Sequence, residues 1–418
     1  FTHLSPDLFV GVGQRLLADL KRLRSMGAEG TGVVRPALSP MDIQARRWLC
    51  DEYAKCALDA SMDGLGNVLG RSRNRGKALL IGSHSDTQPT GGWVDGAMGV
   101  LYGLEVVRAF TEDPDTRDLA VDTVAWQDEE SRFLGCMGSR SYCGEITAEM
   151  LAVARDKDGV MLSDAIEAAG LTNRPYFKAE PKRHIGFLEA HIEQGPILED
   201  EGLKIGIVSS IVGLRGNVFT FHGRQNHAGT TSMARRQDAA TALYEMAHAI
   251  NCEFPKVAGE RSVWTMGRAV IMPGAPSIVP GYAELELQYR DQSTRVLDTM
   301  TAVVEGVIDK INGLGGASVA MRSSAIRVEP AEMDERLKGH IRTAAERNAA
   351  GSWMDMPSGA FHDAGILSSV MPAAMLFIPS IGGISHDFAE DSHHEDIVLG
   401  CQVLADAAAA ILKESLAL

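Results

Sequence analysis

The chain has 418 residues, 45% of them hydrophobic and 23% charged, which is the composition of a globular protein long enough for two or three domains. A formal net charge of −15 argues against a nucleic-acid partner and against binding to an anionic membrane surface, and favours a small-molecule ligand. The opening FTHLSPDLFV lacks a signal-peptide pattern and no apolar run approaches the ~20 residues of a membrane span, so we expect a cytoplasmic protein.

The first half of the chain alternates between predicted strands and helices. The patterns predict a buried strand over 77–84, a helix over 96–110, a strand over 119–130 and another strand over 185–195. This alternation indicates an α/β sheet, in which ligands usually bind beyond the strand ends. Each of these three strands ends in polar residues, so their ends mark the predicted site.

Residues 213–327 follow a different pattern, in the order β-α-β-β-α-β, which is typical of a ferredoxin-like domain. The predicted strands and helices are 216–223, 235–254, 261–272, 282–291, 294–311 and 317–326. A helix (331–349), a loop (357–365), a strand (373–380) and a last helix (396–416) follow.

The expected fold class is therefore α/β, with a large domain built on a central mixed sheet flanked by helices. Residues 1–212 and 328–418 are expected to form this discontinuous, metal-binding catalytic domain, and 213–327 an inserted ferredoxin-like α+β domain.

Five residues from distant segments carry side chains that bind metal ions: His84, Asp95, Glu130, His191 and His386. Imidazole and carboxylate groups together suit Zn, Mn, Co or Ni, and one bridging carboxylate lets two sets of three ligands share a site. Asp95 lies in a glycine-rich turn, where backbone can pass close to two ions, and is the natural bridge. A coincidental scatter of polar residues is the alternative interpretation.

Two neighbouring carboxylates have predicted supporting roles. Asp86 follows His84 by two residues at a strand end, so in extended geometry it would accept the imidazole N–H and fix the tautomer. Adjacent residues of an extended chain point in opposite directions, so Glu130 would bind metal while Glu129 acts as general base on a water molecule. This arrangement predicts hydrolysis of an amide-like bond.

Seven segments together resemble the M20 metallopeptidase superfamily, and within it the hydantoinase/carbamoylase branch of N-carbamoyl-L-amino acid hydrolases, allantoate amidohydrolases and β-ureidopropionases. They are GSHSDTQPTGGWVDG, DEESRFLGCMGSR, HIEQGPILE, GRQNHAGTTSMARRQDA, VPGYAELELQYRD, SGAFHDA and IPSIGGISHDFAE, and they span roughly 80–395. The broader superfamily often carries Glu where HIEQGP has His191, which is characteristic of the carbamoylase branch.

The resemblance implies two divalent metal ions per subunit, with Glu129 as the base. One ion would be held by His84, Asp95 and His191, and the other by Asp95, Glu130 and His386.

The resemblance also implies a lid that closes on substrate. His227 resembles a lid histidine that reaches across a dimer interface to stabilise the oxyanion, and Arg290 resembles an arginine that clamps the substrate carboxylate. A homodimer formed through the inserted domain is therefore expected. Further substrate-binding residues are expected at Gln194, Asn217, Ser277, Gly359 and Ala360.

Three positions depart from the family pattern. Ser277, beside Pro276, replaces an Asn that usually partners the substrate carboxylate, and leaves room for a different or bulkier acid. Phe361 stands where Gly is common and would narrow the pocket or stack on a planar group, and Phe388 stands where Pro is frequent. For His362, packing of the loop and support of catalysis both remain open.

The favoured function is metal-dependent hydrolysis of a C–N bond in a ureido or amide group on a small carboxylate, with N-carbamoyl-L-amino acids as first choice. The alternatives within this class are allantoate and an unusual N-acyl or aromatic amide. A catalytically silent small-molecule-binding protein is the alternative from another class, but a binding module has no use for a base at Glu129.

Overall fold

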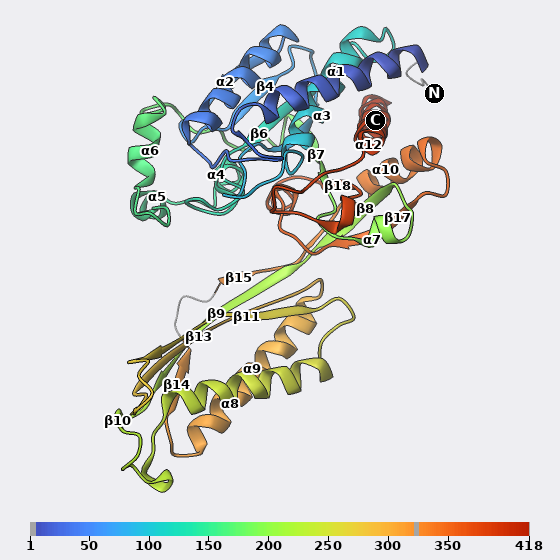
Figure 1. Ribbon diagram of the computed structural model, residues 1–418. Helices are drawn as coiled ribbons and strands as arrows, with labels where there is room; N and C mark the ends of the chain where they lie inside the picture. The colour runs from blue at the N-terminus through green and yellow to red at the C-terminus, as the bar shows by residue number, and fades with distance from the viewer. Residues whose placement is uncertain (1–5, 322–325, 418) are drawn as a thin grey trace. The chain divides into compact units, whose positions relative to one another are not determined.

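The structure is a computed structural model that describes residues 6–321 and 326–417, and the chain divides into two compact units (Figure 1). The larger unit comprises Phe1–Ser209 and Glu332–Leu418, and the smaller one Ser210–Ala331. The predicted insertion, 213–327, lies inside the smaller unit. No membrane-spanning helix is found among the described residues.

Nine strands of the described residues form the mixed sheet of the larger unit. Its four central strands run parallel in the order β18 (Ala373–Ile378), β7 (His184–Ile192), β5 (Ala78–His84) and β6 (Val121–Trp126). Every residue of β5 is buried, as expected for a parallel strand that is covered on both faces. Because the four strands are parallel, their carboxyl ends meet at one edge.

Antiparallel strands extend the sheet on both sides. They are β3 (Asp59–Met62), β4 (Val68–Arg71), β8 (Ile205–Ile211), β16 (Ala331–Glu332) and β17 (Trp353–Ser358). The mixed sheet predicted for the larger domain is thus confirmed.

Helices supply the apolar cover of this sheet. α1 (Pro6–Arg24), α3 (Ala97–Glu112), α10 (Glu335–Asn348) and α12 (His394–Ala417) contribute buried side chains to one core with the strands. α2 (Pro40–Lys55) begins after Ser39, whose hydroxyl accepts the Asp42 N–H and caps the helix. The shorter helices are α4 (Met137–Tyr142), α5 (Ala148–Val153), α6 (Leu162–Ala168), α7 (Ile197–Asp200) and α11 (Asp363–Leu367).

The smaller unit has its own sheet and core. β9 (Gly213–His222), α8 (Ala239–Glu253), β11 (Val263–Met272), β13 (Tyr282–Asp291), α9 (Thr294–Gly313) and β14 (Ser318–Met321) follow in the predicted β-α-β-β-α-β order. β15 (Ile326–Val328) pairs with β9, and the short strands β10 (Asn226–His227) and β12 (Ile278–Val279) pair with each other. Alternate residues of β13 are buried, and they share an apolar core with α8 and α9.

Some predicted boundaries are wrong. The strand predicted over 119–130 ends at Trp126, because Asp128 has the left-handed φ of 58° and turns the chain. The helix predicted over 331–349 begins only at Glu335, since Ala331–Glu332 forms β16 and Asp334 caps the helix. The predicted loop 357–365 contains the end of β17 and the start of α11. Of the strand predicted over 317–326, residues 322–325 lie outside the described part of the chain.

Candidate metal centre

The carboxyl ends of the four parallel strands gather the five candidate metal ligands. His84 is the last residue of β5 and pairs in register with Trp126, the last residue of β6, after which Glu130 follows. His191 lies next to the end of β7 opposite Phe377 of β18, and His386 lies in the segment after β18. Asp95 precedes α3 by two residues. This edge of an α/β sheet is where ligands usually bind.

Two groups of potential ligands share Asp95. In the first, the Nε2 atoms of His84 and His191 lie 3.3 Å and 3.0 Å from the Oδ1 atom of Asp95, and 3.5 Å from each other. In the second, Nε2 of His386 lies 3.5 Å from Oδ2 of Asp95 and 3.6 Å from Oε2 of Glu130. One carboxylate therefore faces one group with each oxygen, which is the arrangement of a bridging ligand.

The two buried imidazoles present the nitrogen that a metal needs. The Nδ1 atom of His84 lies 3.1 Å from the backbone oxygen of Asp86, and Nδ1 of His191 lies 3.0 Å from that of Ile192. With the proton on Nδ1 donated to a carbonyl, Nε2 carries the free electron pair. Nε2 of His191 also accepts the Gly96 N–H at 3.2 Å, in agreement with this tautomer.

An orphaned oxygen and an excess of buried carboxylates fit bound cations. Oδ1 of Asp95 is buried but accepts no hydrogen bond of acceptable geometry from the described residues. Burial and the neighbouring carboxylates raise the pKa of Glu129 and Glu130 well above the usual range. Divalent cations would neutralise this charge, so the residues present suit metal ions.

The prediction that Glu129 and Glu130 point in opposite directions, which assumed an extended chain, is wrong. The strand has already ended, and one carboxylate oxygen from each residue lies within 4.8 Å of the other and of the His84 nitrogen. Oε2 of Glu129 is 3.7 Å from Nε2 of His84. Both carboxylates therefore face the same centre, and the turn at Asp128 is what brings them there.

The Asp86 carboxylate does not accept the His84 N–H. Its Oδ1 atom is 4.0 Å from Nδ1, whereas the backbone carbonyl of Asp86 takes the hydrogen bond, because β5 ends at His84 and the chain turns. Oδ2 of Asp86 accepts the backbone N–H of Glu130 at 3.2 Å. Asp86 thus holds the segment that carries Glu130.

Three residues that sequence reasoning missed also shape the centre. Asp128 is fully buried and accepts the backbone N–H groups of residues 132–134. Gln88 donates to Oε2 of Glu130 at 2.7 Å. Glu390 accepts the Asp95 N–H at 3.1 Å and the His386 N–H at 3.3 Å, so it ties the two loops together. All three are polar residues within the segments that carry the family resemblance, which is their only signal in the sequence.

Several residues at this centre have a strained backbone. Asp128, Cys136, Gln194 and His386 are four of the eight non-glycine residues with positive φ in the described part of the chain. Such conformations persist where surrounding contacts enforce them, and they cluster at functional sites. The side chain of Gln194 donates to Oδ2 of Asp95 at 2.9 Å.

The loop after β17 lies beside His191. The ring of His362 is 4.5 Å from the ring of His191, centroid to centroid, and its Nε2 atom is 3.0 Å from the Ser358 hydroxyl oxygen. The same oxygen accepts the Ala360 N–H at 3.1 Å, and Gly359 lies between them. Burial and the adjacent His191 hold the pKa of His362 well below its usual value, so the ring is neutral. His362 packs the loop against a candidate ligand.

The other predicted substrate-binding residues belong to the smaller unit. β10 and β12 pair His227 with Ile278, and the Ala228 N–H donates to the Ser277 carbonyl at 2.9 Å, so His227 and Ser277 are neighbours. Arg290 projects from the half-exposed face of β13 beside Gln288, to which it donates at 3.1 Å.

Asn217 lies on the other face of that sheet from Arg290. It pairs in register with the buried Leu287, and with Thr301 it is a polar partner of the Tyr289 phenol. Asn217 therefore lies on the buried face of the sheet, beside Leu287 and Tyr289, and not on the face that carries Arg290.

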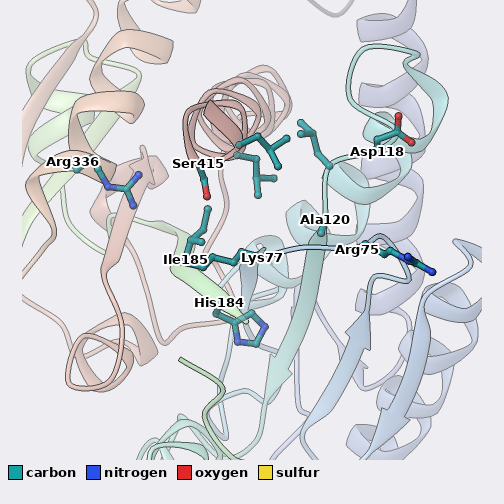
Figure 2. A pocket seen from close by; sticks show the side chains of 11 residues that line it. Arg75, Lys77, Asp118, Ala120, His184, Ile185, Arg336 and Ser415 are labelled. Carbon is teal, nitrogen blue, oxygen red and sulfur yellow. The ribbon is translucent and has the colours of Figure 1, made fainter. Parts of the chain in front are cut away.

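Two cavities flank the larger unit's sheet at opposite ends. One of about 830 Å³ reaches one candidate ligand, Glu130, and is also lined by Asp86 and Gln88 together with apolar residues such as Leu38 and Val160. Another, of about 720 Å³, lies at the amino ends of the parallel strands (Figure 2). Its lining includes Lys77, Ala120 and His184, each at or just before the start of a strand. Ligand sites of such sheets lie at the carboxyl ends, which is the end where the first cavity meets Glu130.

Relatives of known type share this architecture and extend over nearly the whole chain. Residues 80–410 match the model of peptidase family M20/M25/M40. An N-carbamoyl-L-amino-acid amidohydrolase of Paenarthrobacter aurescens is 32% identical over 94% of this chain and 96% of its own, and an allantoate amidohydrolase of Bacillus subtilis is 32% identical over 92% and 94%. The crystal structure of a hydantoinase/carbamoylase family amidase from Burkholderia phymatum is 48% identical, covering 96% of this chain and 98% of that one, with a TM-score of 0.88.

The fold and the ligand groups, taken with these relatives, define a hydrolase of carbon–nitrogen bonds with candidate sites for metal ions. The chain belongs to peptidase family M20/M25/M40, in its hydantoinase/carbamoylase branch.

A Gly96→Ala substitution tests whether the close approach of His84 to the backbone matters. Gly96 has φ +60°, and an added Cβ would lie 2.4 Å from atoms of the His84 ring. We expect Mn²⁺ affinity, measured by titration calorimetry on metal-free protein, to fall by about tenfold or more, because displacing the orientation of a ligand costs this much.

Gly144→Ala is the matched control. Gly144 also has positive φ, at +81°, but an added Cβ would meet nothing within 4 Å. Its substitution should lower stability by about 1–2 kcal/mol through backbone strain and leave Mn²⁺ affinity unchanged. Equal affinities for both variants would contradict the role given to His84.

Proposed function

We propose that the protein hydrolyses the ureido C–N bond of N-carbamoyl-L-amino acids at a centre of two divalent cations. The observation that carries this proposal is the Asp95 carboxylate, buried, with one oxygen directed to each of two groups of potential ligands. The relative from Paenarthrobacter aurescens, named N-carbamoyl-L-amino-acid amidohydrolase, supports the substrate class.

His84, Asp95 and His191 would hold one cation, and Asp95, Glu130 and His386 the other. Ligands of this kind suit Zn, Mn, Co or Ni. When bound, such ions bring the pKa of a water molecule towards ~7 and polarise a carbonyl oxygen.

Glu129 is the proposed general base. Its carboxylate is buried beside His84 and in reach of both ligand groups, and the Cys136 thiol lies 3.7 Å from Oε1. In the first step Glu129 takes a proton from the attacking water as the new C–O bond forms at the ureido carbon. It then returns that proton to the departing amino nitrogen as the C–N bond breaks. The products are the amino acid and carbamate, which decomposes to ammonia and carbon dioxide.

The smaller unit supplies the proposed substrate clamp. Arg290 offers a fork of donors to the substrate carboxylate, and burial, which lowers its pKa, also strengthens such a charge-assisted pair. His227 is exposed on β10, as a group that completes another site requires, and it would stabilise the oxyanion in the partner subunit of a homodimer. Further proposed substrate contacts are Gln194, Ser277, Gly359 and Ala360. The proposed location of the enzyme is the cytoplasm.

Allantoate is the second candidate substrate. The Bacillus subtilis relative named allantoate amidohydrolase is as similar as the first, at 32% identity. Ser277 stands where relatives usually have the longer Asn, and Phe361 in the loop after β17 stands where Gly is common. Both positions therefore bear on the choice between an N-carbamoyl-L-amino acid and allantoate.

Glu129→Gln should lower kcat by about 10²–10⁴-fold, because the amide cannot take up a proton in the hydrolytic step. Metal content, measured by elemental analysis, should equal that of the wild type. Glu130→Gln is the matched control, since it places the same change on a proposed ligand and should reduce the metal content. Full activity of Glu129→Gln would refute its role as base, and a silent binding protein would show no turnover in the wild type either.

The substrate is tested by ammonia release from a panel of N-carbamoyl-L- and D-amino acids, allantoate, β-ureidopropionate and N-acyl amino acids. The acyl compounds are followed by amine release, and the metal-free protein is supplied in turn with Mn²⁺, Zn²⁺, Co²⁺ or Ni²⁺. We expect the highest kcat/KM for an N-carbamoyl-L-amino acid. A preference for allantoate would select the second candidate, and turnover of N-acyl compounds alone would contradict both.

A further inference from the structure

Two arginines that precede the family-matched region, Arg35 and Arg46, are completely buried behind the candidate metal centre. A buried charge is costly unless it is paired and hydrogen-bonded, so each guanidinium must have a specific set of partners. Each guanidinium has partners in one of the two chain segments that carry His84 and Glu129–Glu130.

Arg46 of α2 is hydrogen-bonded to the end of β6. Its Nη1 and Nη2 atoms donate to the backbone oxygens of Ala125 and Trp126, at 3.1 Å and 2.9 Å, and Nη1 also donates to the Gly66 oxygen at 3.2 Å. Its Nε atom donates to Asp42 at 2.8 Å. The chain that leaves these carbonyls leads within four residues to Glu130, so the position of Arg46 sets where the turn begins.

Arg46 also lies beside the carboxylate that holds Glu130. Its Nη2 atom is 3.5 Å from Oδ1 of Asp86, a buried oxygen without a hydrogen bond among the described residues, while Oδ2 of Asp86 accepts the Glu130 N–H. The guanidinium thus lies beside one oxygen of the carboxylate whose other oxygen accepts the Glu130 N–H.

Arg35 fixes the segment after β5 in the same way. Its Nε atom donates to the Ser85 oxygen at 2.7 Å, one residue after His84. The backbone of Arg35 forms two further bonds with Thr87: its N–H donates to the Thr87 hydroxyl at 2.9 Å, and its carbonyl accepts the Thr87 N–H at 3.0 Å. Its Nη1 atom donates to the backbone oxygens of Leu23 and Met26, at 2.8 Å and 2.9 Å, at and just beyond the end of α1.

We propose that Arg35 and Arg46 are positioning residues of the metal centre, which lock the ends of β5 and β6 so that His84, Glu129 and Glu130 converge. This inference rests on the proposed function only in taking those three residues as the metal-binding and basic groups. The planar guanidinium meets several carbonyls at once, which a lysine ammonium at the same place cannot do.

The signal for Arg46 was present in the sequence. Asp42, Arg46, Leu49 and Tyr53 recur at helical spacing and are all buried, so a charged pair at i and i+4 occupies the apolar face of α2. A charged pair on the apolar face of a helix indicates that this face packs against polar backbone groups, which here are the carbonyls at the end of β6. No comparable signal marks Arg35, which lies in an irregular segment.

The test compares Arg46→Lys with Arg183→Lys in the full chain. Arg183 is the control because it, like Arg46, is hydrogen-bonded to a buried carboxylate, here Asp122 at 2.6 Å and 2.7 Å, but at the opposite end of the sheet. Mn²⁺ affinity of the metal-free proteins is measured by calorimetry, thermal unfolding by circular dichroism, and kcat and KM with the best substrate of the panel.

We expect Arg46→Lys to bind Mn²⁺ 10–100-fold more weakly, with a decrease in kcat that is larger than any change in KM. Arg183→Lys should bind Mn²⁺ as the wild type does, even if its melting temperature falls. Thr87→Val removes the hydroxyl that accepts the backbone N–H of Arg35 and leaves the buried charges in place. This variant should also weaken Mn²⁺ binding, and it replaces Arg46→Lys in the test if that protein does not fold. Wild-type affinity in the folded Arg46→Lys or Thr87→Val protein would overturn the inference. Tight Mn²⁺ binding without hydrolysis of any ureido compound would instead overturn the proposed function.

Discussion

The structure depends on one electrostatic constraint, the convergence of several carboxylates in a space largely closed to water. Asp86, Asp95 and Asp128 are buried at this edge of the sheet, with Glu129 and Glu130 beside them. Their mutual repulsion and their loss of hydration must be offset by positive charge. The buried Arg46 supplies positive charge beside Asp86, and the proposed cations would supply it beside Asp95 and Glu130.

Parallel strand pairing explains how residues separated by up to three hundred positions meet. The register of β5 with β6 and of β7 with β18 brings four carboxyl ends to one edge, and the segments that follow turn towards a common point. Asp128, Glu390 and the glycines around Asp95 hold those turns by hydrogen bonds and close backbone approach. The chemistry proposed for Glu129 follows from this convergence, since the base lies on the same turn as a candidate ligand.

Periodicity and strand ends were enough to predict the mixed sheet, the order of elements in the smaller unit and the segments that carry the potential ligands. Turn geometry was not predictable, because the positive φ of Asp128 depends on three backbone N–H groups that its own side chain accepts. Extended-chain reasoning therefore gave the wrong orientation for Glu129 and the wrong acceptor for His84. Partners of buried charges, such as Arg35, could not be found either, since they are defined by carbonyls of distant segments.

The central claim is that two cations share the Asp95 carboxylate. Anomalous diffraction from crystals grown with Mn²⁺ and recorded on both sides of its absorption edge tests it directly. We expect two anomalous peaks separated by about 3.5–4 Å, one near His84 and His191 and the other near Glu130 and His386, with Asp95 between them. A single peak, or two peaks that do not flank Asp95, would contradict it.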